Sequence, residues 1–349
     1  MSHLDGHLSG SFSWTEDREK KTPGLFSDAQ TERNALLENA AVVDFSHLGV
    51  VAVSGEEREK FLSGIITNQI KKVTEGESIH TAMLSPQGRY LWDFTVVEHE
   101  DRYLLITDPD RLPALLNKFR MYLLRTKAQV EDVSDQFGVL GVIGPQTEKF
   151  FGTIFPELLP DEIPLGATFT PEAGVRLWQD PRHGAFGYRL LMAADLIPDW
   201  WQRLTEQLPP AGFESWEHAR IKNSLPRGGN EMIPDTTIPT ETGLVEMNGV
   251  DFTKGCYVGQ ETIARTHHRG TLKKRLHAIT LEGGEALPVG TPILIADDKE
   301  AGILTSLSKD NGNCLGLAIL RLSDVASGKP LTALGRPVTA HKPPWATWT

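Results

Sequence analysis

The residue with the clearest chemical potential is Cys256, which lies in a short segment rich in glycine. Gly255 and Gly259 lie on either side of it and allow tight or positive-φ backbone. Lys254 lies two positions before the cysteine, and the residues Gln260 to Arg265 have the composition of a helix start. A lysine and a helix N-terminus both supply positive charge that favours the thiolate, so the pattern predicts a reactive cysteine. The alternative is a small buried side chain, the commonest fate of a free cysteine.

The elements that must position this segment follow from the hydrophobic pattern. Strands are predicted at 50–53, 90–97, 103–107, 128–133, 139–143 and 187–192, and the second and third of these form a hairpin. Helices are predicted at 199–208, at 214–224 and over a segment that opens near Pro109 or Pro113 and carries apolar residues at helical spacing as far as Leu123. From residue 276 onward, short apolar strands are separated by Gly and Pro, which predicts a small β-barrel or sandwich. The fold class is therefore α+β with a C-terminal β domain.

Composition limits the classes of protein that the chain can belong to. Its 349 residues predict two to three domains, and its net charge of −11 argues against a general nucleic-acid coat protein. Two cysteines cannot form a disulfide framework, which favours reduced thiols in the cytoplasm. No apolar run approaches about 18 residues, and the first residues lack the features of a leader peptide. We therefore expect a soluble cytoplasmic protein with no membrane partner and no metal site.

The cysteine segment resembles the signature of a known family. Lys-Gly-Cys-Tyr-Val-Gly-Gln-Glu, residues 254–261, followed by Arg265, resembles the motif of the YgfZ family of folate-binding proteins. These proteins are relatives of the glycine cleavage T-protein, an aminomethyltransferase. Residues 86–89 with Asp93 resemble the hairpin that faces folate in this family, and residues 220–227 and 239–244 resemble the helix and loop ahead of the cysteine.

The resemblance implies a fold and a division of the chain. The expected fold is a three-lobed ring around a central folate pocket, with a C-terminal small β-barrel. Residues 1–25 would be a loose lead-in, and residues 26–136 plus 212–270 would form a two-part folate-binding α+β lobe. Residues 137–211 would form a second α+β lobe, and residues 271–349 the barrel lobe.

The resemblance also implies a site and a function. The cofactor would be tetrahydrofolate or a one-carbon derivative, and Cys256 would be the catalytic residue. The expected cofactor-binding residues are Asp93, Lys254, Tyr257, Gln260, Glu261 and Arg265. YgfZ-like proteins are tied to the synthesis or repair of iron–sulfur enzymes, including those that thiolate transfer RNA. The implied partners are therefore folate and iron–sulfur client or assembly proteins.

Two differences from the T-protein pattern separate an accessory protein from a transferase. The T-protein has tandem acidic residues after its hairpin glycine, where this chain has Trp92 and Asp93. It also has a glutamate that holds the pterin, whereas the corresponding segment here, residues 183–188, lacks a carboxylate. These losses remove acid–base and anchoring groups for one-carbon transfer. An aminomethyl or methylene transferase of the T-protein type is the alternative function.

A basic cluster supports a third alternative, a non-catalytic module that binds RNA or protein. It consists of Arg265, His267, His268, Arg269, Lys273, Lys274 and Arg275. Such a cluster could attract the glutamate tail of a folate, or it could be a solvated linker. The run has no aromatic residues interleaved for base stacking, so we expect no direct contact with nucleic acid.

Overall fold

The computed structural model describes residues 3–8, 11–160, 162–269, 272–296 and 299–348, with the side chains of His268 and Arg269 also outside the description. The chain divides into two compact units. The first unit comprises Met1–Ala82, Trp92–Trp216 and Asn248–Tyr257, and the second comprises Met83–Leu91, Glu217–Met247 and Val258–Thr349. Each unit is discontinuous in sequence. The three-lobe division stays a prediction.

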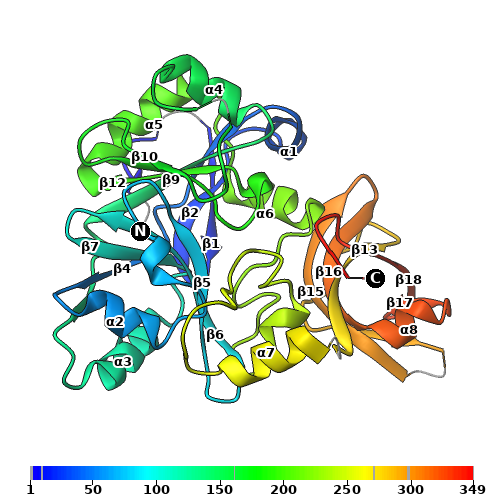
Figure 1. The fold of residues 1–349 in the computed structure, drawn as a ribbon. Helices are drawn as coiled ribbons and strands as arrows, with labels where there is room; N and C mark the ends of the chain where they lie inside the picture. Colours follow the sequence, from blue (N-terminus) through cyan, green and yellow to red (C-terminus); the bar gives the residue numbers. More distant parts are fainter. Residues whose placement is uncertain (1–2, 9–10, 161, 270–271, 297–298, 349) are drawn as a thin grey trace. The chain divides into compact units, whose positions relative to one another are not determined.

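One sheet of the first unit contains the predicted hairpin. Its strand order is β5-β6-β7-β4-β8, where β5 is Ile79–Leu84, β6 Tyr90–His99, β7 Arg102–Thr107, β4 Gly49–Ser54 and β8 Gln129–Asp132. β6 and β7 pair antiparallel, with Thr95 opposite Ile106, as predicted. Helices α2 (Arg58–Ser63) and α3 (Leu112–Leu123) meet through Phe61 and Phe119, and Phe119 also contacts Phe94 of β6. The two helices therefore cover the face of β6 that carries Phe94 (Figure 1).

The second sheet of this unit joins segments far apart in the sequence. Its order is β10-β11-β12-β9-β3, where β10 is Thr168–Phe169, β11 Arg176–Gln179, β12 Tyr188–Ala193, β9 Phe137–Ile143 and β3 Ala41–Asp44. Its helices are α1 (Ala29–Glu38), α4 (Thr147–Ile154) and α5 (Ile197–Thr205). All seven residues of β9 are buried, as the unbroken apolar run predicts. Because β9 pairs with β3, residue 137 begins a strand but not a separate sheet.

The prediction of a loose lead-in over residues 1–25 is wrong for residues 13–25. Strands β1 (Ser13–Asp17) and β2 (Lys20–Leu25) pair antiparallel, with Asp17 opposite Lys20. The two turn residues, Arg18 and Glu19, both have positive φ, 51° and 66°. This turn type matches the right-handed twist of the strands, and Asn-Gly or Asp-Gly is its usual sequence. Because Arg-Glu is not a usual sequence for this turn, the hairpin cannot be recognised from the sequence.

The second unit contains the predicted C-terminal barrel. It closes in the order β13-β16-β15-β14-β17-β18, because β13 pairs with both β16 and β18. The bounds are β13 Lys274–Leu281, β14 Pro292–Ile295, β15 Lys299–Asp310, β16 Asn313–Arg321, β17 Leu331–Ala333 and β18 Arg336–His341. Ile279, Ile293, Leu304 and Cys314 belong to its core. The mixed α and β fold with a C-terminal barrel is thus confirmed.

The remaining helices lie wholly or partly in the second unit. Helix α6 (Phe213–Lys222) ends in the second unit, the short α8 (Leu322–Ala326) follows β16, and α7 (Gln260–Arg269) begins just after the glycine-rich segment (Figure 1). Short 3-10 turns, among them η1 (Ile70–Lys72), η2 (Gly184–Phe186), η3 (Ala194–Leu196) and η4 (Pro239–Glu241), join the longer elements. Within the described residues, every helix is too short or too polar to cross a membrane.

Candidate functional site

Cys256 is exposed, in contrast to Cys314, which is buried in the barrel core. Its loop ends at Gly259, where φ is +83° and a Cβ atom would lie 2.6 Å from the Ser85 carbonyl oxygen. No larger residue fits there without strain, so the predicted tight backbone is confirmed at this glycine. Among the described atoms, a Cβ on Gly255 would meet nothing within 4 Å.

Within the first unit, Lys254 anchors the cysteine loop to residues 63–68. Its Nζ donates hydrogen bonds to the backbone oxygens of Ser63, Ile66 and Asn68, at 3.0, 2.6 and 2.9 Å. An ammonium group has three hydrogens, and each of these carbonyls can take one. Burial lowers the pKa of Lys254 to about 8, with Asp251 partly opposing that shift. This geometry makes Lys254 a fastener and gives no support to its predicted contact with a cofactor.

Two further residues hold the same loop. The Asp251 carboxylate accepts hydrogen bonds from the Thr253 amide and hydroxyl at 2.7 and 2.6 Å, and it pairs with Lys72 at 2.9 Å. Burial opposes its ionisation, but these partners hold its pKa at about 2. Tyr257 is buried, and burial raises its pKa to about 12. The loop is therefore fixed on both sides of the exposed thiol.

Asp93 lies on β6 and pairs with His80 of the adjacent strand β5. His80 Nε2 is 3.2 Å from Asp93 Oδ2, and the two side chains are 2% and 13% exposed. Because side chains alternate along a strand, Asp93 lies on the opposite face from Phe94 and therefore away from α2 and α3. The carboxylate is held by a buried imidazole and keeps a small exposed surface. This is a suitable acceptor for an N–H group of a ligand.

Asp180 and Arg182 follow strand β11 and add a second pair of charges. Arg182 donates to Asp180 through Nε at 2.9 Å and Nη2 at 2.7 Å. Burial opposes the charge on each, yet their attraction lowers the pKa of Asp180 and raises the pKa of Arg182. The charges of Asp93 and Asp108 also favour charged Arg182, which lies over the Phe186 ring at 3.7 Å.

Arg18, from the turn of the N-terminal hairpin, completes this group of charges. Its Nη1 is 3.4 Å from Asp108 Oδ2, and it also pairs with Asp110. The polar cluster of Asp93, His80, Asp108, Asp180, Arg182 and Arg18 thus offers carboxylate acceptors and guanidinium donors together. Sequence reasoning found only Asp93. The sequence signal for the rest is weak, because Asp180-Pro181-Arg182 is typical of an ordinary loop.

Hydrogen bonds connect the polar cluster to the cysteine loop. The Asn68 side chain donates to the carbonyls of His80 and Asn248, both at 2.8 Å. The Asn248 side chain in turn donates to the Pro181 carbonyl at 3.1 Å. The Asn68 carbonyl is one of the three that accept from Lys254. One hydrogen-bond network within the first unit therefore joins Lys254 to the backbone near Asp93 and Arg182.

The other predicted cofactor-binding residues lie in the second unit. Glu261 and Arg265 on α7 are exposed, and Gln260 is half-buried. Their contacts with a cofactor stay predictions.

One member of the basic cluster, Arg275, is engaged by other groups of the protein. Arg275 donates to the Thr240 carbonyl at 2.8 Å, pairs with Glu246 and stacks on Trp348 at 4.4 Å. His267 and Lys273 are exposed, whereas the side chains of His268 and Arg269 lie outside the described residues.

Comparisons with known proteins agree with the fold. Residues 11–251 match the family model described as the GCVT N-terminal domain, and residues 273–348 match the CAF17 C-terminal beta-barrel domain. An aminomethyltransferase of Staphylococcus carnosus is 25% identical, covering 88% of this chain and 86% of its own length. The mitochondrial iron–sulfur cluster assembly factor IBA57 of Mus musculus is 31% identical, covering 78% of this chain and 75% of its own length.

The similarity extends to a solved structure. The crystal structure of glycine cleavage system aminomethyltransferase T from Bartonella henselae has a TM-score of 0.81 at 16% identity, covering 96% of this chain and 94% of that one. At this identity the match shows the fold alone. The match of residues 11–251 to the GCVT N-terminal domain model confirms the predicted kinship with the glycine cleavage T-protein. The chain belongs to the GCVT N-terminal domain family and carries a CAF17-type C-terminal β-barrel.

Proposed function

We propose that this protein binds a reduced folate at the polar cluster and acts through Cys256 as an accessory factor in iron–sulfur cluster assembly or repair. One observation carries the proposal: an exposed thiol on a loop that Lys254 fastens to the same hydrogen-bonded network as Asp93 and Arg182. The IBA57 relatives bear the name of iron–sulfur cluster assembly factors, which supports the role of the thiol.

The chemistry of the polar cluster fits a folate. A pterin ring presents N–H donors, and a carboxylate such as that of Asp93 can accept hydrogen bonds from them. His80 holds this carboxylate in place. The glutamate end of a folate is anionic, and Arg182, whose side chain is 18% exposed, is a suitable partner for it. We propose tetrahydrofolate or a one-carbon derivative as the occupant.

The same geometry disfavours one-carbon transfer of the T-protein type. Trp92, which replaces one of the tandem acids, is buried, and Arg111 lies over its ring at 4.5 Å. Asp180 is the acid nearest in sequence to the segment without a carboxylate, and Arg182 already holds both of its oxygens. Asp93 therefore acts alone among the expected acids.

Aminomethyl transfer is the second candidate, because the aminomethyltransferase relative aligns over 86% of its own length. It predicts turnover of an aminomethyl or methyl donor in the presence of tetrahydrofolate, with a lower rate in Asp93→Asn. Binding of tetrahydrofolate without any turnover excludes it.

The role of the thiol is tested by complementation of a deletion strain, with the activity of an iron–sulfur enzyme as the measurement. Cys256→Ala and Cys256→Ser should fail to restore that activity, while the matched control Cys314→Ala should restore it if the barrel remains folded. Full rescue by both Cys256 variants would contradict the proposal. We also propose that the clients include enzymes that thiolate transfer RNA and that the protein is cytoplasmic. The content of thiolated transfer RNA in the same deletion strain tests the choice of client.

A further inference from the structure

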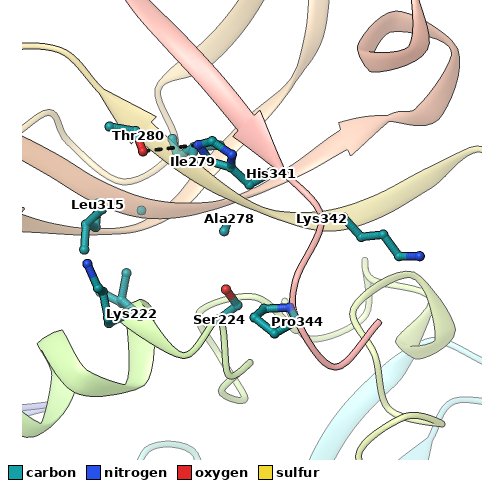
Figure 2. Close-up of a pocket in the computed structure, with 11 residues that line it drawn as sticks. Lys222, Ser224, Ala278, Ile279, Thr280, Leu315, His341, Lys342 and Pro344 are labelled. Atoms are coloured by element: carbon teal, nitrogen blue, oxygen red, sulfur yellow. Dashed lines mark hydrogen bonds between the residues drawn. The ribbon is translucent and has the colours of Figure 1, made fainter. Parts of the chain in front are cut away.

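The second unit contains a hollow that the proposed function does not use. It lies between the end of α6, the outer face of strands β13, β16 and β18, and the segment that follows β18 (Figure 2). Its volume is about 210 Å³. Sites for drug-sized ligands begin at about 300 Å³, so the occupant of this hollow must be smaller.

The register of the barrel explains why the hollow is there. Ala278 of β13 lies opposite Leu317 of β16 and His341 of β18, so these side chains share one face. On that face, Leu276 and Leu317 are buried against Ile221 of α6. Ala278 interrupts the row of larger side chains, and its single methyl group leaves the space open. Figure 2 shows Ala278 at the centre of the hollow.

The wall formed by the C-terminal segment is fixed in place. Trp345 Nε1 donates to the Ser224 carbonyl at 2.9 Å, and its ring lies where a Cβ on Gly243 would approach it to 2.5 Å. Trp348 lies over the guanidinium of Arg275 at 4.4 Å. These contacts hold the chain that follows Pro344. A preformed wall lowers the entropic penalty of binding.

The lining of the hollow combines an apolar floor with positive charge. Ala278 and Leu315 supply hydrocarbon, whereas the side chain of Ile279, the next residue on β13, lies in the barrel core. Lys222 also lines the hollow, and the described lining includes no carboxylate, although the chain carries a net charge of −11. The ammonium group of Lys342 instead donates to the Trp348 carbonyl. The side chain of Lys222 is 49% exposed, and its Nζ is 3.6 Å from Asp310, beyond ordinary hydrogen-bond length. This ammonium group can therefore turn to a ligand.

We propose that this hollow binds a small apolar monocarboxylate. Its hydrocarbon part would cover Ala278, and its carboxylate would be bound by Lys222 and the hydroxyl group of Ser224, which Figure 2 shows directed toward Ala278. A free phosphate fits less well, because a dianion would lie against the apolar floor. The site is independent of the polar cluster in the first unit.

The test is a titration of the full chain with benzoate, in which binding is measured by ligand-observed NMR. Millimolar affinity is expected for so small a ligand. Ala278→Leu should fill the space and weaken binding at least tenfold, and Lys222→Gln should weaken it about fivefold. Lys273→Gln, an exposed lysine outside the lining, is the matched control and should leave the affinity unchanged.

Other probes separate the parts of the proposal. Benzamide, which has the same shape without the charge, should bind at least fivefold more weakly than benzoate. Equal binding of benzamide and benzoate, displacement of benzoate by inorganic phosphate, or unchanged binding in Ala278→Leu would each overturn the proposal. If Ala278→Leu fails to fold, Lys222→Gln still decides, since its side chain is half exposed.

Discussion

Replacing Lys254 by methionine should release the cysteine loop from residues 63–68. The change removes three hydrogen bonds from a charged donor and leaves three backbone carbonyls without it. Hydrogen bonds to charged groups contribute about 1.5–3 kcal/mol each, while burial of the ammonium group opposes that gain. We expect the loop to lose about 3 kcal/mol of local stability.

Amide hydrogen exchange measures this loss where it occurs. The Asp251 amide donates to the Thr67 carbonyl at 3.1 Å, across the contact that Lys254 fastens. At about 1.4 kcal/mol per factor of ten, its exchange should become about 100-fold faster in Lys254→Met. Lys72→Met is the matched control, because this half-exposed lysine pairs with Asp251 but donates to none of the three carbonyls, so a smaller increase in exchange is expected. Equal exchange rates in the two variants would refute the role of Lys254 as a fastener.

Three further outcomes follow from the geometry. Gly259→Ala should lower the free energy of unfolding by about 1–3 kcal/mol because of its positive φ and close contact, whereas Gly255→Ala should change it by less than about 0.5 kcal/mol; equal thermal midpoints would contradict this. Asp251 has its pKa lowered to about 2, so its stabilisation is present above about pH 4 and is lost as the pH falls toward 2. Asp251→Asn should therefore be about 2 kcal/mol less stable than the parent in urea at pH 7 and equally stable near pH 2, and a constant difference would argue against it. Glu231 is fully buried and pairs with Arg220 at 2.9 Å, so Glu231→Gln should lower the free energy of unfolding of the second unit by about 3–5 kcal/mol. A loss under about 1 kcal/mol would be inconsistent with a buried ion pair.

The sequence alone predicted the elements whose signal is local. Strand β9 is an unbroken apolar run, the β6–β7 hairpin consists of aromatic and β-branched strands, and the barrel strands are separated by glycine and proline. The N-terminal hairpin was missed because Arg18 and Glu19 adopt positive φ without the usual turn residues. The pairing of β3 with β9 was also missed, since no local pattern specifies which strands meet across about 100 residues.

The site was predictable only where a motif marks it. Cys256 and Asp93 stood out through the resemblance, and the exposure of the thiol agrees with the reactive interpretation. Lys254 was assigned to a cofactor because a charged residue in a motif suggests a ligand contact. Its actual acceptors lie at residues 63–68, almost 190 positions away, and no sequence pattern reveals them. The partnership of Arg182 with Asp180, Asp93 and Asp108 likewise depends on how the chain folds.

The central claim, a reduced folate held by Asp93 in the first unit, is tested most directly by calorimetric titration with tetrahydrofolate. Asp93→Ala should weaken binding about 10- to 100-fold, the loss expected for one charged hydrogen bond. Asp101→Ala, at the exposed turn of the same β6–β7 hairpin, should bind like the parent. No binding by the parent protein, or equal affinity in Asp93→Ala, would contradict the account.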